Sequence, residues 1–325
     1  MALIEVKNLV KKYGDLTAVK GISFEVHQGE IFGFLGPNGA GKTTTISILC
    51  TLIAPTGGSA TVNGLDVVSD PNEVREQIGL VFQDPSLDER LTGRENMEFH
   101  SVIYGVPPEQ RKPRLESVLR MVELYDRMND RVETYSGGMK RRLEIARGLL
   151  HYPKVLFLDE PTIGLDPQTR ANIWAYMHQL RVQENITVFL TTHYMDEAEN
   201  CNRIAVIDYG EIIALGTPEE LKGLVGGDLI EIKTDNDVDA RRELIERYGV
   251  EMIERPDCLC FEVDNGHEFV PNLVRDLGAK VLSVSIRRPT LDDVFLKLTG
   301  HQIRPEGAEV SARAMGMRAQ RRTGR

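Results

Sequence analysis

Residues 36–43 read Gly-Pro-Asn-Gly-Ala-Gly-Lys-Thr and match the pattern G-x-x-x-x-G-K followed by Ser or Thr. The apolar run 31–35 precedes this segment, and residues 44–52 follow it with the spacing of a helix. Glycines let successive backbone N–H groups face one anion, and the start of a helix adds partial positive charge. The sequence therefore predicts a strand, a phosphate-binding loop and a helix. A glycine-rich turn without this role is the alternative, and the strand and helix context disfavours it.

This loop supplies most of the predicted nucleotide contacts. Lys42 is expected to reach the β- and γ-phosphates of a nucleotide, and the Thr43 hydroxyl is expected to ligate Mg²⁺. The other predicted nucleotide-binding residues of the loop and the first helical turn are Gly36, Pro37, Asn38, Gly39, Ala40, Gly41 and Thr44.

A second motif carries two carboxylates. The apolar run 155–158 ends in Asp159 and Glu160, and ligands of α/β sheets collect at the carboxyl ends of strands. Asp159 is predicted to bind Mg²⁺, directly or through water. Glu160 is predicted to orient and polarise the attacking water, because phosphoryl transfer depends on positioning and charge stabilisation. The alternative is an acidic strand end that serves only as surface.

A third motif is a glycine turn that opens a helix. Ser136 is a natural N-cap, Gly137 and Gly138 follow it, and a helix N-terminus is an anion site. The segment 135–139, Tyr-Ser-Gly-Gly-Met, resembles the signature motif of ATP-binding-cassette (ABC) ATPases. It has Tyr and Met where the commonest signature has Leu and Gln, but it keeps Ser136 and Gly138, the positions that face phosphate.

The resemblance assigns roles to four further residues and names the cofactors as ATP and Mg²⁺. Tyr13 resembles the aromatic residue that stacks on adenine, and Asp166 resembles the D-loop aspartate at the nucleotide site. Gln83 resembles the Q-loop glutamine, which is expected to act in catalysis and at the metal. His193, which follows an apolar run and two threonines, resembles the γ-phosphate sensor and is expected to act in catalysis with Glu160.

Residues 1–225 are expected to form an α/β P-loop ABC ATPase domain. Strand-like runs at 4–10 and 18–26 predict an antiparallel β flap, and residues 84–130 have helical spacing that suits a helical subdomain. Short apolar runs predict a core parallel sheet covered by helices on both faces, with strands at 155–158, 188–190 and 204–207. A hairpin strand is expected at 212–215, and the Gly-rich segment 223–227 is the expected linker.

Residues 226–300 are expected to form a small α+β accessory domain. The segment order is strand, helix, strand, strand, helix, strand, or βαββαβ, which matches the ferredoxin-like arrangement and implies no chemistry by itself. A last helix is expected at 291–298. Residues 301–325 are rich in Arg and poor in apolar side chains, so they are expected to be a disordered basic tail.

Composition limits the possible partners. The net charge of −10 and the pI near 5.3 disfavour a general attraction to nucleic acid. Apolar runs fall short of the roughly eighteen residues that a membrane span needs, and the N-terminus lacks a leader pattern, so a chain that is neither exported nor membrane-spanning is expected. The four cysteines include no C-x-x-C pair and are expected to be reduced thiols.

The resemblance also implies partners. In the ABC family two ATPase copies form a head-to-tail homodimer that holds ATP between the phosphate loop of one copy and the signature of the other. Residues 288–300 resemble the closing motif of drug-resistance ABC exporters of the daunorubicin type. The expected function is therefore the ATP-hydrolysing subunit of an exporter for a drug, a lipid or another substrate. It would act at the cytoplasmic face of the membrane, bound peripherally to a separate permease. The alternative is a soluble ABC ATPase with a nucleic-acid, translation or regulatory role.

Overall fold

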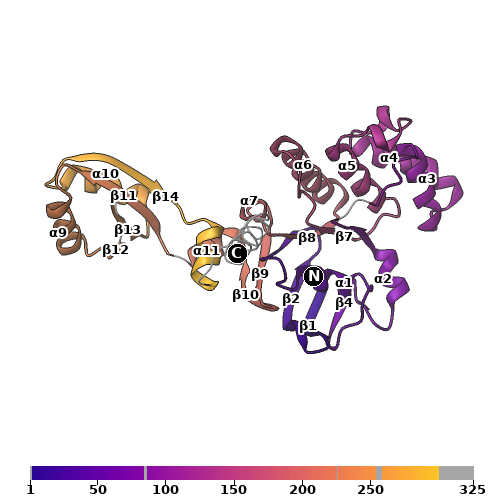
Figure 1. Cartoon of the computed structure of the whole chain (residues 1–325), viewed down its shortest axis with the longest axis horizontal. Helices are drawn as coiled ribbons and strands as arrows, with labels where there is room; N and C mark the ends of the chain where they lie inside the picture. Colours follow the sequence, from indigo (N-terminus) through magenta and orange to yellow (C-terminus); the bar gives the residue numbers. More distant parts are fainter. Residues whose placement is uncertain (1, 84–85, 225, 254–257, 300–325) are drawn as a thin grey trace, which may run out of the picture. The chain divides into compact units, whose positions relative to one another are not determined.

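A computed structural model describes residues 2–83, 86–224, 226–253 and 258–299 (Figure 1). Contacts divide the described chain into two compact units, the first ending at Leu215 and the second beginning at Gly216. The expected basic tail, 301–325, lies outside the described residues. Each unit has its own buried core.

The first unit contains the expected antiparallel flap. Strands β1 (Ala2–Tyr13) and β2 (Leu16–His27) pair antiparallel, and β1 also pairs with β4 (Gly57–Val62), which continues into β5 (Leu65–Asp66). The sheet order is β2-β1-β4-β5. Alternate side chains of β2 are buried, as a sheet with one covered face requires.

A six-stranded sheet forms the centre of this unit. Its strands, in spatial order, are β10 (Glu211–Gly216), β9 (Arg203–Asp208), β3 (Ile31–Leu35), β8 (Thr187–Thr192), β7 (Val155–Asp159) and β6 (Ile78–Val81). The pairs from β9 through β6 are parallel. Every residue of β3, β7 and β8 is buried, which explains why their sequences are nearly continuous apolar runs. The register pairs Leu35 with Thr192 and Asp159 with Thr191, so the ends of β3, β7 and β8 meet at one edge.

The helices of the first unit are α1 (Lys42–Leu49), α2 (Pro71–Gln77), α3 (Gly93–Ile103), α4 (Pro108–Met121), α5 (Gly137–Gly148), α6 (Pro167–Glu184) and α7 (Met195–Ala198). Helices α3, α4 and α5 pack on one another, in agreement with the expected helical subdomain (Figure 1). Thr92 starts α3 with a capping box, in which its hydroxyl accepts from Glu95 N and the Glu95 carboxylate accepts from Thr92 N. Short 3₁₀ turns at Tyr125–Arg127 and Val132–Thr134 lead toward α5.

The second unit has the expected βαββαβ order. Its elements are β11 (Asp228–Thr234), α9 (Asp237–Tyr248), β12 (Met252–Ile253), β13 (Leu259–Val263), α10 (Gly266–Asp276) and β14 (Val281–Arg287). The sheet order is β12-β13-β11-β14 with antiparallel neighbours, which is the ferredoxin-like topology. The helices α9 and α10 contact β11 and supply apolar side chains to one core.

Two further helices, α8 (Pro218–Gly223) and α11 (Leu291–Thr299), show where the first unit ends and the second begins. Helix α8 contacts α11, and both helices belong to the second unit. Leu221 of α8 and Val294 and Phe295 of α11 are each about 1% exposed. The contacts therefore divide the chain before α8, whereas the glycines had indicated a linker at 223–227.

Among the helices of the described residues, none combines the length and the apolar character needed to cross a membrane. The four cysteines are free thiols, and burial raises the pKa of Cys50 and Cys201 above that of an ordinary thiol.

Candidate functional site

The loop 36–41 joins β3 to α1 in a conformation that needs glycine. Gly39 has a φ of 82°, and Gly41, which caps α1, has a φ of 107°. A Cβ atom on Gly41 would lie 2.6 Å from the carbonyl oxygen of Ala18. Pro37, Asn38 and Ala40 complete the loop, and Thr44 lies in the first turn of α1. The structure thus has the strand, loop and helix that the sequence predicts.

Lys42 lies against the loop with only 5% of its surface exposed. Its Nζ atom donates hydrogen bonds to the carbonyl oxygens of Gly36, at 2.8 Å, and Pro37, at 3.1 Å. The same Nζ lies 3.4 Å from Glu160 Oε1, so the two side chains form a buried ion pair. These contacts therefore hold the lysine charge beside the loop.

Thr43 and Asp159 place two hard oxygen donors together. The Thr43 hydroxyl lies 3.5 Å from Asp159 Oδ1, and the same carboxylate oxygen accepts a hydrogen bond from Thr191. Asp159 is 4% exposed at the end of β7. Such oxygens suit Mg²⁺. In the described part of the chain no group of three His, Cys, Asp or Glu side chains could hold a metal, so a cation here would also need ligand oxygens.

Glu160 follows β7 in a left-handed backbone conformation with a φ of 46°. Its N–H donates to the Thr191 hydroxyl at 3.0 Å, which helps to hold that conformation. Burial opposes ionisation of the side chain, but the hydrogen bond with His193 and the nearby charge of Lys42 outweigh it, so the pKa of Glu160 lies below its ordinary value. Glu160 is therefore an anion in a buried position, as a base that polarises water must be.

His193 follows β8 and is 5% exposed. Its Nδ1 atom lies 3.2 Å from Glu160 Oε1. Its Nε2 atom is buried and has no hydrogen-bond partner in the structure. A buried polar atom without a partner is unusual in a protein, and an oxygen of a bound ligand would satisfy it. Lys42, at the start of α1, thus converges with Glu160 and His193, which directly follow β7 and β8.

Gln83 lines a cavity of about 140 Å³ together with Glu160 and with Gly137 and Lys140 of α5. Residues 36–44 do not line it, although all of them lie in the described part of the chain. The start of α5 thus shares a cavity with Glu160 but not with the phosphate loop of its own chain.

The start of α5 is built as the sequence predicts. The Ser136 hydroxyl accepts from Met139 N at 3.3 Å, which makes Ser136 the N-cap. A Cβ atom on Gly138 would lie 2.4 Å from Cγ2 of Thr169, so glycine allows the close packing of α5 on α6. Gly137 is exposed, which leaves the helix N-terminus open to a partner.

Asp166 and Tyr13 lie outside the Lys42–Glu160–His193 cluster. Asp166 caps α6 by accepting from Thr169 N at 3.0 Å and from the Thr169 hydroxyl at 2.6 Å, and these bonds lower the pKa of its carboxyl. Tyr13 ends β1 and is 48% exposed, with Lys11 Nζ 5.2 Å from its ring centroid. An exposed ring can accept a stacked base.

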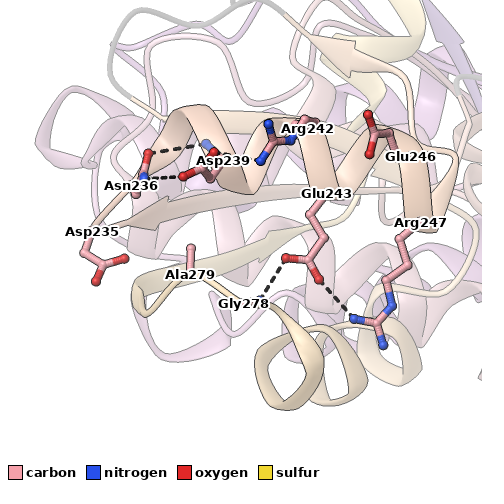
Figure 2. A pocket seen from close by; sticks show the side chains of 9 residues that line it. All are labelled: Asp235, Asn236, Asp239, Arg242, Glu243, Glu246, Arg247, Gly278 and Ala279. Atoms are coloured by element: carbon pink, nitrogen blue, oxygen red, sulfur yellow. Dashed lines mark hydrogen bonds and ion pairs between the residues drawn. The ribbon is translucent and has the colours of Figure 1, made fainter.

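A second cavity, of about 610 Å³, lies in the second unit against α9 (Figure 2). Its charged side chains bond mainly to one another and to the backbone. Glu243 accepts from Arg247 at 3.0 Å and from Gly278 N at 2.9 Å, and Arg242 donates to Asp239 at 3.0 Å. This cavity contains none of the predicted site residues.

Comparison with known proteins identifies the arrangement. A family model described as ABC transporter matches residues 19–163, and a model described as ATP-binding protein DrrA1-3-like, C-terminal domain, matches residues 216–299. The daunorubicin resistance ATP-binding protein DrrA2 of Streptomyces coeruleorubidus is 41% identical over 95% of this chain and 98% of its own. This chain belongs to the ABC transporter family of ATP-binding proteins. It is an ABC ATPase that binds and hydrolyses nucleotide.

Other relatives of this ABC ATPase agree with the assignment. The linearmycin resistance ATP-binding protein LnrL of Bacillus subtilis is 39% identical and covers 93% of this chain and all of its own length. Among solved structures, the ATP-binding cassette MJ0796, in a dimeric post-hydrolysis state bound to ADP and Pi, matches with a TM-score of 0.59 and 30% identity. That match covers 66% of this chain and 98% of the cassette.

Arg141 is a residue of the ABC ATPase site that sequence reasoning missed. It lies on α5, is 7% exposed, and donates to the carbonyl oxygens of Phe82, Pro161 and Asp159 at 2.6, 2.7 and 3.2 Å. It also pairs with Glu144 at 3.0 Å. Arg141 thus ties the signature helix to the segments that carry Gln83 and Glu160. Its i,i+3 spacing from Glu144 was the one local signal, and a run of helical charges usually indicates a solvated face.

Proposed function

We propose that this ABC ATPase powers export through a separate membrane permease by binding Mg²⁺ and ATP between two copies of itself. Support comes from relatives named for resistance to daunorubicin and to linearmycin, which match more than nine-tenths of this chain. The match includes the C-terminal domain, which a model of DrrA-like proteins describes. Export of a drug, a lipid or another substrate is therefore the best supported activity.

The observation that carries the proposal is the convergence of Lys42, Glu160 and His193 at one edge of the core sheet. The Lys42 ammonium would bind the phosphates of ATP. The Glu160 carboxylate would orient water and accept its proton, and His193 Nε2 would lie at the γ-phosphate as its sensor. Thr43 and Asp159 would hold Mg²⁺, which neutralises phosphate charge when it is bound. Gln83, which lines a cavity together with Glu160, would contact the water or the metal.

A second copy would complete the site with the N-terminus of its α5. That N-terminus carries partial positive charge and is open at Gly137. The dimeric MJ0796 cassette, at 30% identity, is consistent with this arrangement. Asp166 would act near the same interface, and Tyr13 would stack on adenine.

The permease would dock on the helical subdomain, which places the ATPase at the cytoplasmic face of the membrane as a peripheral subunit. Helix α3 exposes three large apolar side chains, Phe99, Val102 and Ile103, which are 59%, 55% and 58% exposed. Exposed apolar side chains that lie together are typical of protein interaction sites.

Glu160→Gln tests the assigned base. The variant keeps the shape of the side chain but cannot accept a proton, so it should bind ATP, form a dimer and hydrolyse ATP about 100-fold more slowly. Phosphate release and light scattering on a sizing column, both with Mg²⁺ and ATP, measure these outcomes. Glu184→Gln, the same change at an exposed residue near the end of α6, is the control and should behave like the unmodified chain. Normal turnover by Glu160→Gln would refute the role.

The permease proposal has a separate test. The ATPase should appear in the membrane fraction when a permease is co-expressed and not when it is expressed alone. Stable association with DNA or ribosomes, without membrane recovery, would instead support the soluble alternative.

A further inference from the structure

We propose that Glu197 is a positioning residue that couples the Glu160 loop, the His193 segment and the start of α6, and that Arg170 is its partner. The inference rests on the roles proposed above for Glu160 and His193. Glu197 lies on α7 and is 2% exposed. An ionised carboxylate is costly to bury unless several partners compensate it, so its contacts must explain why it is there.

The Glu197 carboxylate accepts hydrogen bonds from two threonines that lie beside the reacting residues. One oxygen accepts from the hydroxyl of Thr162, two residues after Glu160. The other accepts from the hydroxyl of Thr192, directly before His193, at 2.9 Å. Thr162 and Thr192 are each about 1% exposed. One carboxylate therefore fixes the loop after β7 against the end of β8, where Glu160 and His193 are 3.2 Å apart.

Arg170 extends this connection to α6, the helix that Asp166 caps. Its Nε atom lies 3.5 Å from Glu197 Oε1, and its guanidinium carbon lies 4.8 Å from the ring centroid of Tyr194. The Tyr194 ring lies against the His193 ring, with centroids 4.1 Å apart. Arg170 N also donates to Asp166 O at 2.9 Å, in the first turn of α6. A shift at the start of α6 thus has a direct packing route to His193.

The Glu197 carboxylate accepts from Thr162 and Thr192 and lies 3.5 Å from Arg170 Nε, so it acts on the reacting residues through these three partners. Its effect is on geometry. Loss of one charged partner lets the Thr162 and Thr192 segments move separately, and a displacement of about 1 Å can cost up to about 100-fold in rate. Binding of ATP depends on the loop 36–43 and Lys42. The loop meets this network through the hydrogen bond from Gly36 N to Thr192 O, a backbone contact that continues the β3–β8 ladder and that a change of the Glu197 side chain leaves in place. The geometry predicts a change in kcat with little change in KM.

Glu197→Gln in the full chain tests this inference, with Asp196→Asn as control. Asp196 is the exposed neighbour on the same helix, so the control removes the same charge without breaking the network. In Glu197→Gln we expect kcat to fall about tenfold, while KM and the affinity for a fluorescent ATP analogue change by less than about twofold. The ring resonances of His193, measured by NMR on nucleotide-free protein, should shift or broaden. Asp196→Asn should leave all of these unchanged.

Arg170→Gln is a second variant that keeps the inference testable if Glu197→Gln fails to fold. The Arg170 side chain is 29% exposed, so its loss is more easily tolerated. It should also lower kcat, and the double variant should be no slower than the slower single variant, because both changes break one connection. If folded Glu197→Gln matches Asp196→Asn in kcat and in the His193 resonances, the inference is wrong. A lack of ATPase activity in the unmodified chain would instead refute the proposed function.

Discussion

Gly36→Ala is the sharpest test of how the fold positions the phosphate loop. Gly36 directly follows β3, and its N–H donates to Thr192 O at 3.2 Å. A Cβ atom there would lie 2.2 Å from the carbonyl oxygen of Ile207 and 2.9 Å from Ile207 Cγ2. Real Cβ atoms essentially never approach closer than 3.0 Å. The end of β3 and the end of β9 must therefore separate by about 0.8 Å at this point.

The expected losses of stability and of ATP affinity follow from that separation. Overpacking a dense core usually costs about 1–3 kcal/mol, and Ile207 O is backbone, so it cannot turn aside as a flexible side chain could. For a domain of this size each kcal/mol lowers Tm by about 2–4 °C, which predicts a fall of about 2–12 °C. The same displacement moves Pro37 O and Gly36 O, which hold Lys42. We expect ATP affinity to fall at least about tenfold.

Thermal unfolding and titration with a fluorescent ATP analogue measure the two effects. Gly64→Ala is the matched control. Gly64 has a φ of 78° and nothing within 4 Å of its Cβ position, and it lies in the turn between β4 and β5. It should lose about 1–2 kcal/mol through backbone strain and keep its ATP affinity. If Gly36→Ala matches Gly64→Ala in ATP affinity, the argument that β9 sets the position of the loop is wrong.

Two further predictions concern binding and pH. Lys42→Ala should lose at least about tenfold in ATP affinity because it removes the ammonium that the loop holds. Unchanged binding in an equilibrium titration would contradict the phosphate-binding role of the loop 36–43 and Lys42. Burial, with a smaller effect of the Arg147 charge, lowers the pKa of His100 to about 4 from an ordinary value of 6.5. Between these pH values His100 is protonated in the unfolded chain and neutral in the folded chain. The pKa shift of His100 therefore lowers the free energy of unfolding as pH falls from 6.5 to 4, by at most about 3 kcal/mol. Urea unfolding should show a shallower pH dependence in His100→Gln, and equal slopes would contradict the pKa shift.

The sequence predicted those parts of the fold that depend on local pattern. The runs at 155–158 and 188–190 are short and apolar because β7 and β8 are covered on both faces, and that pattern needs no knowledge of the partners. Strands β4 and β5 were missed. β4 begins with Gly-Gly-Ser, a sequence typical of a loop. It forms a strand because it pairs antiparallel with β1. That pairing is a tertiary effect that local propensity does not contain.

For the site, too, the sequence predicted what depends on local pattern and missed what depends on tertiary contacts. Asp159 and Glu160 were found because carboxylates end an apolar run, but the left-handed φ of Glu160 depends on Thr191 of the neighbouring strand. Arg141 and Glu197 were missed because a charged residue on a helix normally faces water. Their burial is visible only when the segments that they join, far apart in the sequence, are brought together.

The ion pair between Lys42 and Glu160 also determines what the Glu160 charge costs in ATP affinity. Lys42 is paired with Glu160 at 3.4 Å, so a phosphate group must compete with a carboxylate for the same ammonium. The phosphates would also lie near a second anion, and like charges in a buried site repel strongly. Glu160→Gln removes both effects, so it should bind ATP more tightly than the unmodified chain even though it turns over more slowly. An affinity that weakens together with the rate would mean that Glu160 holds the loop in place, and the separation of binding by Lys42 from catalysis by Glu160 would then fail.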